Sequence, residues 1–123
     1  DVTVFDAASG TLWTGDLLFI ERTPAVDGDV RGWLAAIDAL KRVPAAITIP
    51  GHGPVTRDKN RALERERAYL AALLQDVRGS IRKGGSMTET METAAAAERG
   101  RWQLFDAVNR RNVNLLYPKL EWE

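Results

Sequence analysis

The sequence predicts an α/β fold, with a short sheet in the first half of the chain and helices in the second. Residues 2–14 are rich in β-forming side chains, and residues 30–42 carry apolar side chains at helical spacing. A short apolar segment over 45–49 follows and is stopped by Pro50 and Gly51. Strand, helix and strand in this order are typical of a βαβ-like unit with a covered sheet.

The first element is a predicted hairpin over residues 2–14, in which two β-rich runs flank the turn signal Ala8-Ser9-Gly10. Gly15 and Asp16 then interrupt the second strand. The apolar residues 17–20 are too few to be assigned from periodicity.

A loop and a helix come next. Residues 21–29 contain a proline, a glycine and two aspartates, which predicts a loop. Asp27 or Asp29 could cap the amphipathic helix that follows over about 30–42. Pro44 ends this helix.

The second half of the chain is predicted to be helical. Thr56 is a candidate cap for a long helix over about 57–83, with apolar residues on one stripe, and Gly84-Gly85 is its stop signal. A capping box from Ser86 to Glu89 predicts a short helix as far as about Ala97, broken by Gly100. A last helix begins near Trp102 and ends near Pro118. We therefore expect a single domain, 1–123, with an α/β part over 1–56 and a helical part over 57–123.

Composition excludes several classes of protein. The chain has 17 basic and 17 acidic side chains, so it lacks the basic excess typical of nucleic-acid binders, and we expect no nucleic-acid partner. It has no cysteine, which removes disulfides, thiolate ligands and cysteine nucleophiles. No apolar stretch approaches the roughly 18 residues that span a bilayer, so we expect no membrane segment. The start at Asp1 resembles the middle of a strand, which indicates a fragment or a processed product.

The arginines of the long helix are interleaved with acids. Residues 57–67 hold five basic side chains together with Asp58, Glu64 and Glu66. This pattern is typical of a solvated helix face with ion pairs between residues four apart.

The only histidine, His52, lies in the segment Ile49-Pro50-Gly51-His52-Gly53-Pro54-Val55. It follows a predicted buried strand, at the end where open α/β sheets gather ligands. Glycines on both sides allow close backbone approach and unusual φ values, and prolines fix the flanks. These features favour a metal-binding or catalytic side chain. The other interpretation is a tight turn with an incidental surface histidine.

Asp16 is the second candidate site residue. It follows Gly15 at a predicted strand end, and the apolar residues behind it suggest a buried carboxylate that needs a metal ion or a cation as a partner. The alternative is an aspartate that caps a turn through nearby backbone amides. Together, Asp16 and His52 offer an oxygen and a nitrogen donor, which suit zinc. A catalytic zinc takes three or more protein ligands, so two do not complete a site. The remaining acids Asp27, Asp29 and Asp38 are expected to be capping and surface residues.

The ordered segments resemble the C-terminal half of metallo-β-lactamase-fold hydrolases. The segments that carry the resemblance are Asp1–Asp6, Thr11-Leu12-Trp13-Thr14-Gly15-Asp16-Leu17-Leu18-Phe19 and the Pro-Gly-His-Gly loop at residues 50–53. The tail, with Arg101–Phe105, Arg111-Asn112-Val113 and Leu120–Glu123, is similar to the quinoprotein-associated zinc metallohydrolase branch. That branch implies a periplasmic location.

The resemblance implies half of a four-layer αββα sandwich with an α-helical C-terminal tail. It also implies two zinc ions, of which Asp16 bridges the pair and His52 binds the second. The family's HxHxDH motif has no counterpart in this chain, so we expect the chain alone to be inactive and to bind zinc weakly or not at all. Half of a sandwich exposes an apolar sheet face, which favours pairing with the missing N-terminal half or self-association as a homo-oligomer. The family chemistry is hydrolysis of an ester, amide or thioester by a metal-bound water.

The alternative function is a non-catalytic α/β module that docks proteins through its tryptophan-bearing faces. The aromatic side chains Trp13, Trp33, Trp102 and Trp122 are scattered along the chain, which suits core or interface positions better than a stacking platform.

Overall fold

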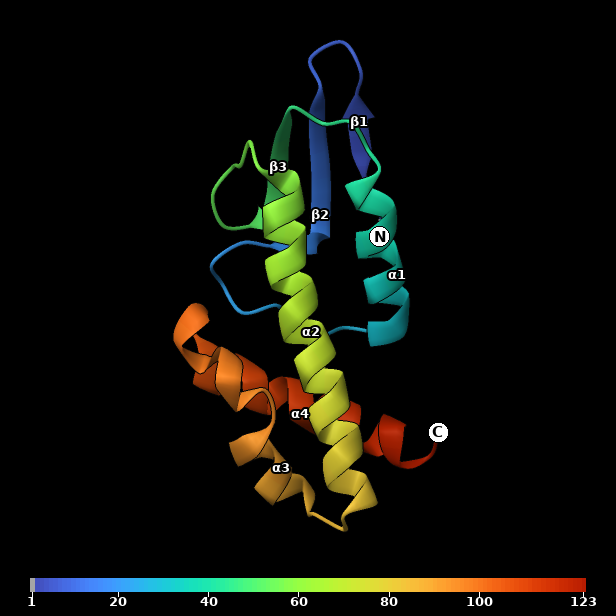
Figure 1. Ribbon diagram of the computed structural model, residues 1–123, viewed down its shortest axis with the longest axis vertical. Coiled ribbons are helices and arrows are strands. Elements are labelled where there is room, and N and C mark those ends of the chain that lie inside the picture. Colours follow the sequence, from blue (N-terminus) through green and yellow to red (C-terminus); the bar gives the residue numbers. More distant parts are fainter. Residues whose placement is uncertain (1) are drawn as a thin grey trace.

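The computed structural model of the protein describes residues 2–123; Asp1, at which the predicted domain begins, lies outside them. Three strands form one sheet in the order β1-β2-β3 (Figure 1). Strand β1 (Val4–Asp6) pairs antiparallel with β2 (Thr11–Phe19), and β2 pairs parallel with β3 (Ile47–His52). The predicted hairpin and the parallel pairing of a βαβ-like unit are thereby confirmed.

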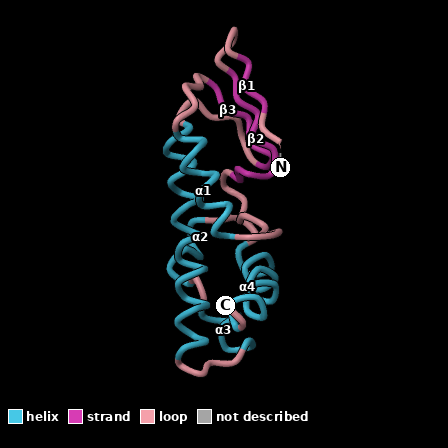
Figure 2. Tube along the Cα trace, turned by 90° about the vertical axis from the view of Figure 1, so that its right-hand side faces the viewer, coloured by secondary structure: helices cyan, strands magenta, loops and turns pink. Residues whose placement is uncertain are grey.

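The helices account for most of the remaining residues. They are α1 (Val30–Lys41), α2 (Lys59–Arg82), α3 (Met87–Thr93), the 3-10 helix η1 (Ala96–Arg101) and α4 (Phe105–Glu121). Figure 2 shows α1 and α2 on one side of the sheet, with α3 and α4 beside the far end of α2. The protein is a mixed α/β fold, as the sequence predicts.

Helix α1 is capped at both ends by side chains. Asp29, one of the two candidate caps, accepts a hydrogen bond from the backbone N–H of Arg31. At the other end, the buried Lys59 ammonium donates to the carbonyl oxygens of Leu40, Lys41 and Val43 at 2.6, 2.9 and 2.5 Å. The carbonyls of Leu40 and Lys41 belong to the last turn of α1, where no partner is offered within the helix, and the cation also suits the negative end of the helix dipole. Burial lowers the pKa of Lys59.

Both long strands extend further than predicted. Strand β2 continues through Gly15 and Asp16 to Phe19, and β3 continues through the segment 50–52. Gly15 was expected to break the strand. Its φ of +56° instead places a register shift in the β2–β3 ladder, after which pairing resumes between Phe19 and His52. An irregular ladder of this kind also tolerates a proline, which cannot donate a ladder hydrogen bond.

The boundaries of the long helix and the last helix also differ from the predicted ones. Asp58, not Thr56, caps α2 by accepting from the N–H of Arg61. The hydroxyl of Thr56, just before the cap, accepts from the N–H of Asp58. Pro118 lies inside α4 and does not end it. A proline removes only one hydrogen bond, and this one lies close to a helix end where packing of Leu116 and Leu120 continues.

The capping box is confirmed at the start of α3. Ser86 and Glu89 exchange side chain-to-backbone hydrogen bonds at 3.1 and 3.2 Å. The helix ends at Thr93, earlier than predicted, because Ala95 adopts a left-handed φ of 57°. The chain then continues as η1, which includes Gly100, so this glycine does not act as the expected break.

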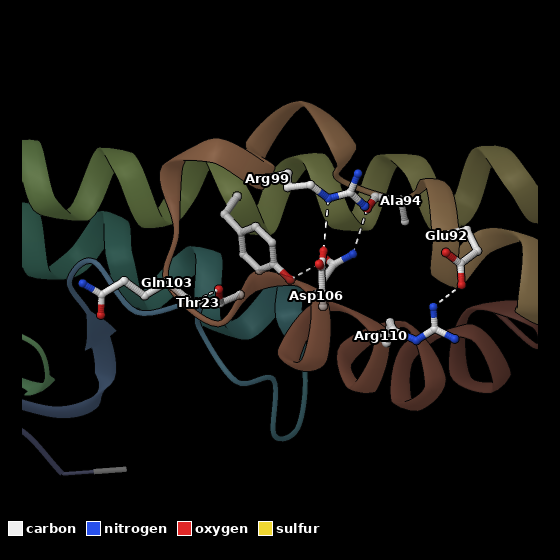
Figure 3. A network of polar contacts seen from close by, with 9 residues as sticks. Thr23, Glu92, Ala94, Arg99, Gln103, Asp106 and Arg110 are labelled. Atoms are coloured by element: carbon white, nitrogen blue, oxygen red, sulfur yellow. Dashed lines mark hydrogen bonds and ion pairs between the residues drawn. The ribbon is translucent and has the colours of Figure 1, made fainter.

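A buried polar network joins α2 and α4. The Tyr69 hydroxyl donates to Asn109 Oδ1 at 2.7 Å and accepts from Asn112 Nδ2 at 2.9 Å. Asn109 in turn donates to the carbonyl of Ala94. Figure 3 shows this region, with the Thr23–Gln103 contact nearby and the surface ion pair between Arg110 and Glu92. Burial raises the pKa of Tyr69, so its hydroxyl keeps its proton.

The sheet surface away from α1 and α2 carries an apolar row. Val4, Trp13 and Ile49 are direct partners across the three strands. Val4 and Trp13 are 54% and 41% exposed, whereas Leu12, the next residue of β2, is 1% exposed beneath the helices. The sheet is thus covered on one face by this chain, and the row on its other face is open to solvent.

Candidate functional site

Asp16 and His52 lie side by side. Asp16 Oδ1 is 3.3 Å from His52 Nε2. Both residues stand in the C-terminal portions of the parallel strands β2 and β3, which end at the same edge of the sheet. Ligands of open α/β sheets gather at this edge. The two candidate residues of the sequence therefore meet, although 35 residues separate them along the chain.

The glycines beside His52 are required by close backbone approach. A Cβ on Gly51 would lie 2.5 Å from the carbonyl oxygen of Gly15 and 2.7 Å from Asp16 Oδ1. Gly53 has a φ of +101°, and a side chain there would meet the backbone of Ile20. The expected role of these glycines is confirmed: they let the His52 loop press against strand β2.

The imidazole has an aromatic neighbour. The rings of Phe19 and His52 are stacked with centroids 4.5 Å apart and planes 13° from parallel. They are ladder partners, and the His52 carbonyl accepts a hydrogen bond from the N–H of Ile20 at 2.9 Å. Backbone pairing and stacking together fix the direction of the ring.

The carboxylate of Asp16 differs from the expectation of a buried acid. Its side chain is 69% exposed, and that of His52 is 38% exposed. The apolar residues after Asp16 point elsewhere: Leu18 and Phe19 are buried in the core, whereas Asp16 opens to solvent. The pair is therefore reachable by a ligand, and its own attraction adds only about 0–1 kcal/mol of stability.

A cleft of about 680 Å³ adjoins the pair. Asp16 and His52 line one part of it, and the indole of Trp33 is fixed in its wall by a 2.8 Å hydrogen bond from Nε1 to the Leu17 carbonyl. Further lining comes from the loop before α1 and from α4: Arg22, Thr23, Ala25, Val26, Asp27, Val108 and Arg111. The volume suits a small organic molecule.

Sequence reasoning missed the arginines of this cleft. Arg22 lies in the loop after β2, and Arg111 comes from α4 and donates to the Val26 carbonyl at 3.3 Å. Arg111 was noted only as part of the tail. No periodic signal links residues so far apart; only the packing of α4 against the loop brings them to one cleft.

The other acids have the ordinary roles that were expected. Asp29 caps α1, and Asp38 forms an ion pair with Arg67 at 3.1 Å. Asp27 lines the cleft. None of them joins Asp16 and His52, since residues 2–123 contain no group of three or more His, Cys, Asp or Glu side chains that could hold a metal ion.

A buried carboxyl group lies behind the stacked pair. Glu66 of α2 is 0% exposed and accepts a hydrogen bond from the N–H of Phe19 at 2.9 Å. Its other oxygen, Oε2, has no hydrogen-bond partner in the described chain. Burial raises the pKa of Glu66 well above its ordinary value, because the apolar surroundings disfavour the charged form.

The ion pairs expected along the first turns of α2 do not form. Glu64 pairs with Lys41 of α1, Glu66 is buried, and Asp58 caps the helix. Because each acid has another partner, Arg61 and Arg65 are left without an ion pair inside the described part of the chain.

No family model matches the chain, and no curated protein matches it. Within the described residues, the helices are too short or too polar to cross a membrane.

Proposed function

We propose that this chain supplies part of the metal site of a zinc-dependent hydrolase of the metallo-β-lactamase fold, as the C-terminal half of its αββα sandwich. The observation that carries the proposal is the 3.3 Å approach of Asp16 Oδ1 and His52 Nε2 at the shared end of two parallel strands. A solvent-open carboxylate and an imidazole on a rigid glycine-flanked loop are the donor types that zinc prefers.

The donor set fits zinc but is incomplete. Asp16 and His52 would hold the ion, and catalytic zinc takes at least three protein ligands. In the proposed complete protein, the remaining ligands come from the HxHxDH segment of the missing half. Zinc supplies Lewis acidity, which polarises a carbonyl oxygen and makes water nucleophilic at neutral pH.

The residues of this chain have distinct roles in the proposal. The carboxylate of Asp16 would hold the ion together with His52 and would orient the attacking water, because it is exposed and lies beside the imidazole. Phe19 holds the plane of His52 by stacking. The cleft beside them binds an ester, amide or thioester substrate, with Trp33 as an apolar wall.

Zinc titration by calorimetry tests the ligand assignment. We expect the chain to bind Zn²⁺ far more weakly than the ~10–16 kcal/mol of complete structural zinc sites. Asp16→Ala and His52→Ala should each abolish this binding, while Asp27→Ala, in the same cleft, should leave it unchanged. If Asp16→Ala and His52→Ala both bind Zn²⁺ as the wild type does, these residues are not the zinc ligands. One tightly bound zinc per chain with hydrolytic turnover would contradict the proposal that the site is incomplete.

A protein-interaction module is the second candidate function, favoured by the open apolar row of Val4, Trp13 and Ile49. The interaction-module hypothesis is supported if Asp16→Ala and His52→Ala change neither metal binding nor stability, and if a partner protects Trp13 from solvent. If the chain is instead half of a hydrolase, the partner that protects Trp13 is expected to carry the HxHxDH segment.

A further inference from the structure

Phe19 lines a second hollow in addition to the cleft. Its volume is about 270 Å³, and it is formed by the end of β2, the start of α2 and the end of η1. Its apolar side chains are Phe19, Ile20, Ala62 and Trp102, of which Phe19 and Trp102 are only 5% and 9% exposed. Neither Asp16 nor His52 lines it.

Three arginines surround this apolar floor. Arg61 and Arg65 lie four residues apart on α2, and Arg101 ends η1. Arg101 pairs with Glu98 at 3.1 Å, whereas the guanidinium groups of Arg61 and Arg65 have no ion pair among residues 2–123. Glu64, which precedes Arg65 on the same helix, pairs with Lys41.

Two acids also line the hollow, and neither forms an ion pair with these arginines within the described residues. The Asp58 carboxylate is occupied as the cap of α2, where it accepts from the N–H of Arg61 at 3.2 Å. Glu21 is exposed and has a left-handed φ of 69°, a conformation that costs a non-glycine residue free energy and is enriched at functional sites.

From this placement we infer that the hollow is a binding site for an oxyanion carried on an apolar body, such as an organic phosphate or carboxylate. The planar guanidinium groups of Arg61 and Arg65 present paired N–H donors that match phosphate and carboxylate oxygens. The apolar part of the ligand covers Phe19, Ile20 and Trp102. The site is independent of the proposed zinc ligands and holds even if no zinc binds.

Titration of the intact chain with defined probes tests this inference, with the amide resonances of Glu21, Ala62 and Trp102 followed by NMR. Phenyl phosphate and benzoate are the two anionic probes; their relative affinity distinguishes phosphate from carboxylate ligands. Benzyl alcohol has the apolar body alone, and inorganic phosphate has the anion alone. We expect saturable shifts with at least one anionic probe, and affinities for both controls at least about tenfold weaker.

Matched arginine variants locate the site. Arg65→Gln and Arg61→Gln should each weaken the anionic probe by about tenfold, because each removes a charged hydrogen-bond donor. Arg57→Gln removes an exposed arginine just before α2 that does not line the hollow, and it should change the affinity by less than about twofold. Arg65→Lys keeps the charge without the paired donors and should give an intermediate loss.

The variants are expected to fold, since the side chains of Arg61 and Arg65 are exposed and make no internal ion pair, and thermal unfolding checks this. The inference is wrong if Arg57→Gln loses as much affinity for the anionic probe as Arg61→Gln and Arg65→Gln. It is also wrong if neither anionic probe causes a saturable shift at Trp102. Binding that persists in Asp16→Ala supports its independence from the proposed zinc site.

Discussion

Gly51 sets the distance between the two candidate ligands. Replacing it by alanine places a Cβ 2.5 Å from the backbone of Gly15 and 2.7 Å from Asp16 Oδ1, so β2 and β3 must separate. We expect Gly51→Ala to destabilise the protein by about 1–3 kcal/mol. Chemical denaturation measures this loss, and NMR contacts between Asp16 and His52 should weaken.

Gly100 provides the matched control for that substitution. A Cβ there meets nothing within 4 Å, and its φ is not in the left-handed region. Gly100→Ala should therefore leave both stability and the site contacts nearly unchanged. If the two alanine variants behave alike, close packing at Gly51 does not hold the site together.

Glu66 gives a prediction about pH. Its folded-state pKa lies well above 4.5 because of burial, whereas the unfolded chain has an ordinary carboxyl group. As pH rises above 4.5, the unfolded chain releases this proton while the folded chain retains it, so the free energy of unfolding falls. Glu66→Gln cannot titrate, so its unfolding free energy should depend less on pH above 4.5 than that of the wild type.

Denaturation at a series of pH values measures these slopes. Glu64→Gln is the control, because the Glu64 side chain on the same helix is 59% exposed. This variant keeps Glu66, so its unfolding free energy should depend on pH as in the wild type. Identical slopes in wild type and Glu66→Gln would show that the buried carboxyl does not titrate as described.

Prediction from sequence succeeds at the residue scale where chemistry is local. The Asp29 cap and the box of Ser86 and Glu89 depend on a few neighbouring residues. The glycines beside His52 were recognisable from their own segment, although the contact that requires Gly51 comes from strand β2. The prediction that Asp16 is buried was wrong, because burial depends on which elements cover the strand. Successive side chains of a strand point to opposite faces of the sheet, so apolar neighbours in sequence do not show whether a residue between them is buried.

At the scale of elements, α4 holds the loop that lines the cleft. The buried amide of Asn112 accepts from the N–H of Val26 at 2.9 Å and donates to the carbonyl of Pro24 at 2.8 Å. Without it, two buried backbone groups lose their partners. We expect Asn112→Ala to lower the free energy of unfolding by about 1–3 kcal/mol and to speed amide exchange at Val26.

The exposed Asn114 on the same helix is the control for this prediction. Asn114→Ala removes an amide of the same size without touching the loop, so exchange at Val26 should stay slow. Fast exchange at Val26 in both variants would point to a general loosening of α4. Exchange that stays slow in Asn112→Ala would mean that the loop does not need this helix.

The kinds of elements were predictable, and their ends were less so. Apolar spacing predicted the helices because one face of each packs on the core. Strand β2 was cut short at Gly15 because a glycine usually signals a break, yet partner β3 continues its ladder beyond it. Pro118 was read as a stop, but tertiary packing carries α4 past it to Glu121.

For the whole molecule, the cleft could not be predicted, because its wall joins residues from the sheet, a loop and the last helix. Arg22 and Arg111 are 89 positions apart and meet only through the packing of α4 on the loop. The mixed α/β architecture is predictable from the order of patterns. Which distant side chains share a cavity depends on how those elements pack.

The open sheet face gives the prediction at this scale. Trp13 lies in the centre of the row between Val4 and Ile49, and it is 41% exposed on the sheet face that points away from α1 and α2. Exposed apolar rows of this kind are stabilised by burial against another surface, at about 25 cal/mol for each Å² removed from water. We expect the isolated chain to self-associate through this face, with sedimentation showing species above 13.6 kDa as concentration rises.

Trp13→Glu places a charge in the centre of the row and should weaken self-association by at least about tenfold, because the carboxylate must be desolvated in the interface. Trp122 is the matched control: it is 86% exposed at the end of α4, away from the sheet. Trp122→Glu removes an equally large apolar side chain but should leave association unchanged. If wild type sediments as a 13.6 kDa monomer at all concentrations, or if both variants dissociate alike, the sheet face is not the interface.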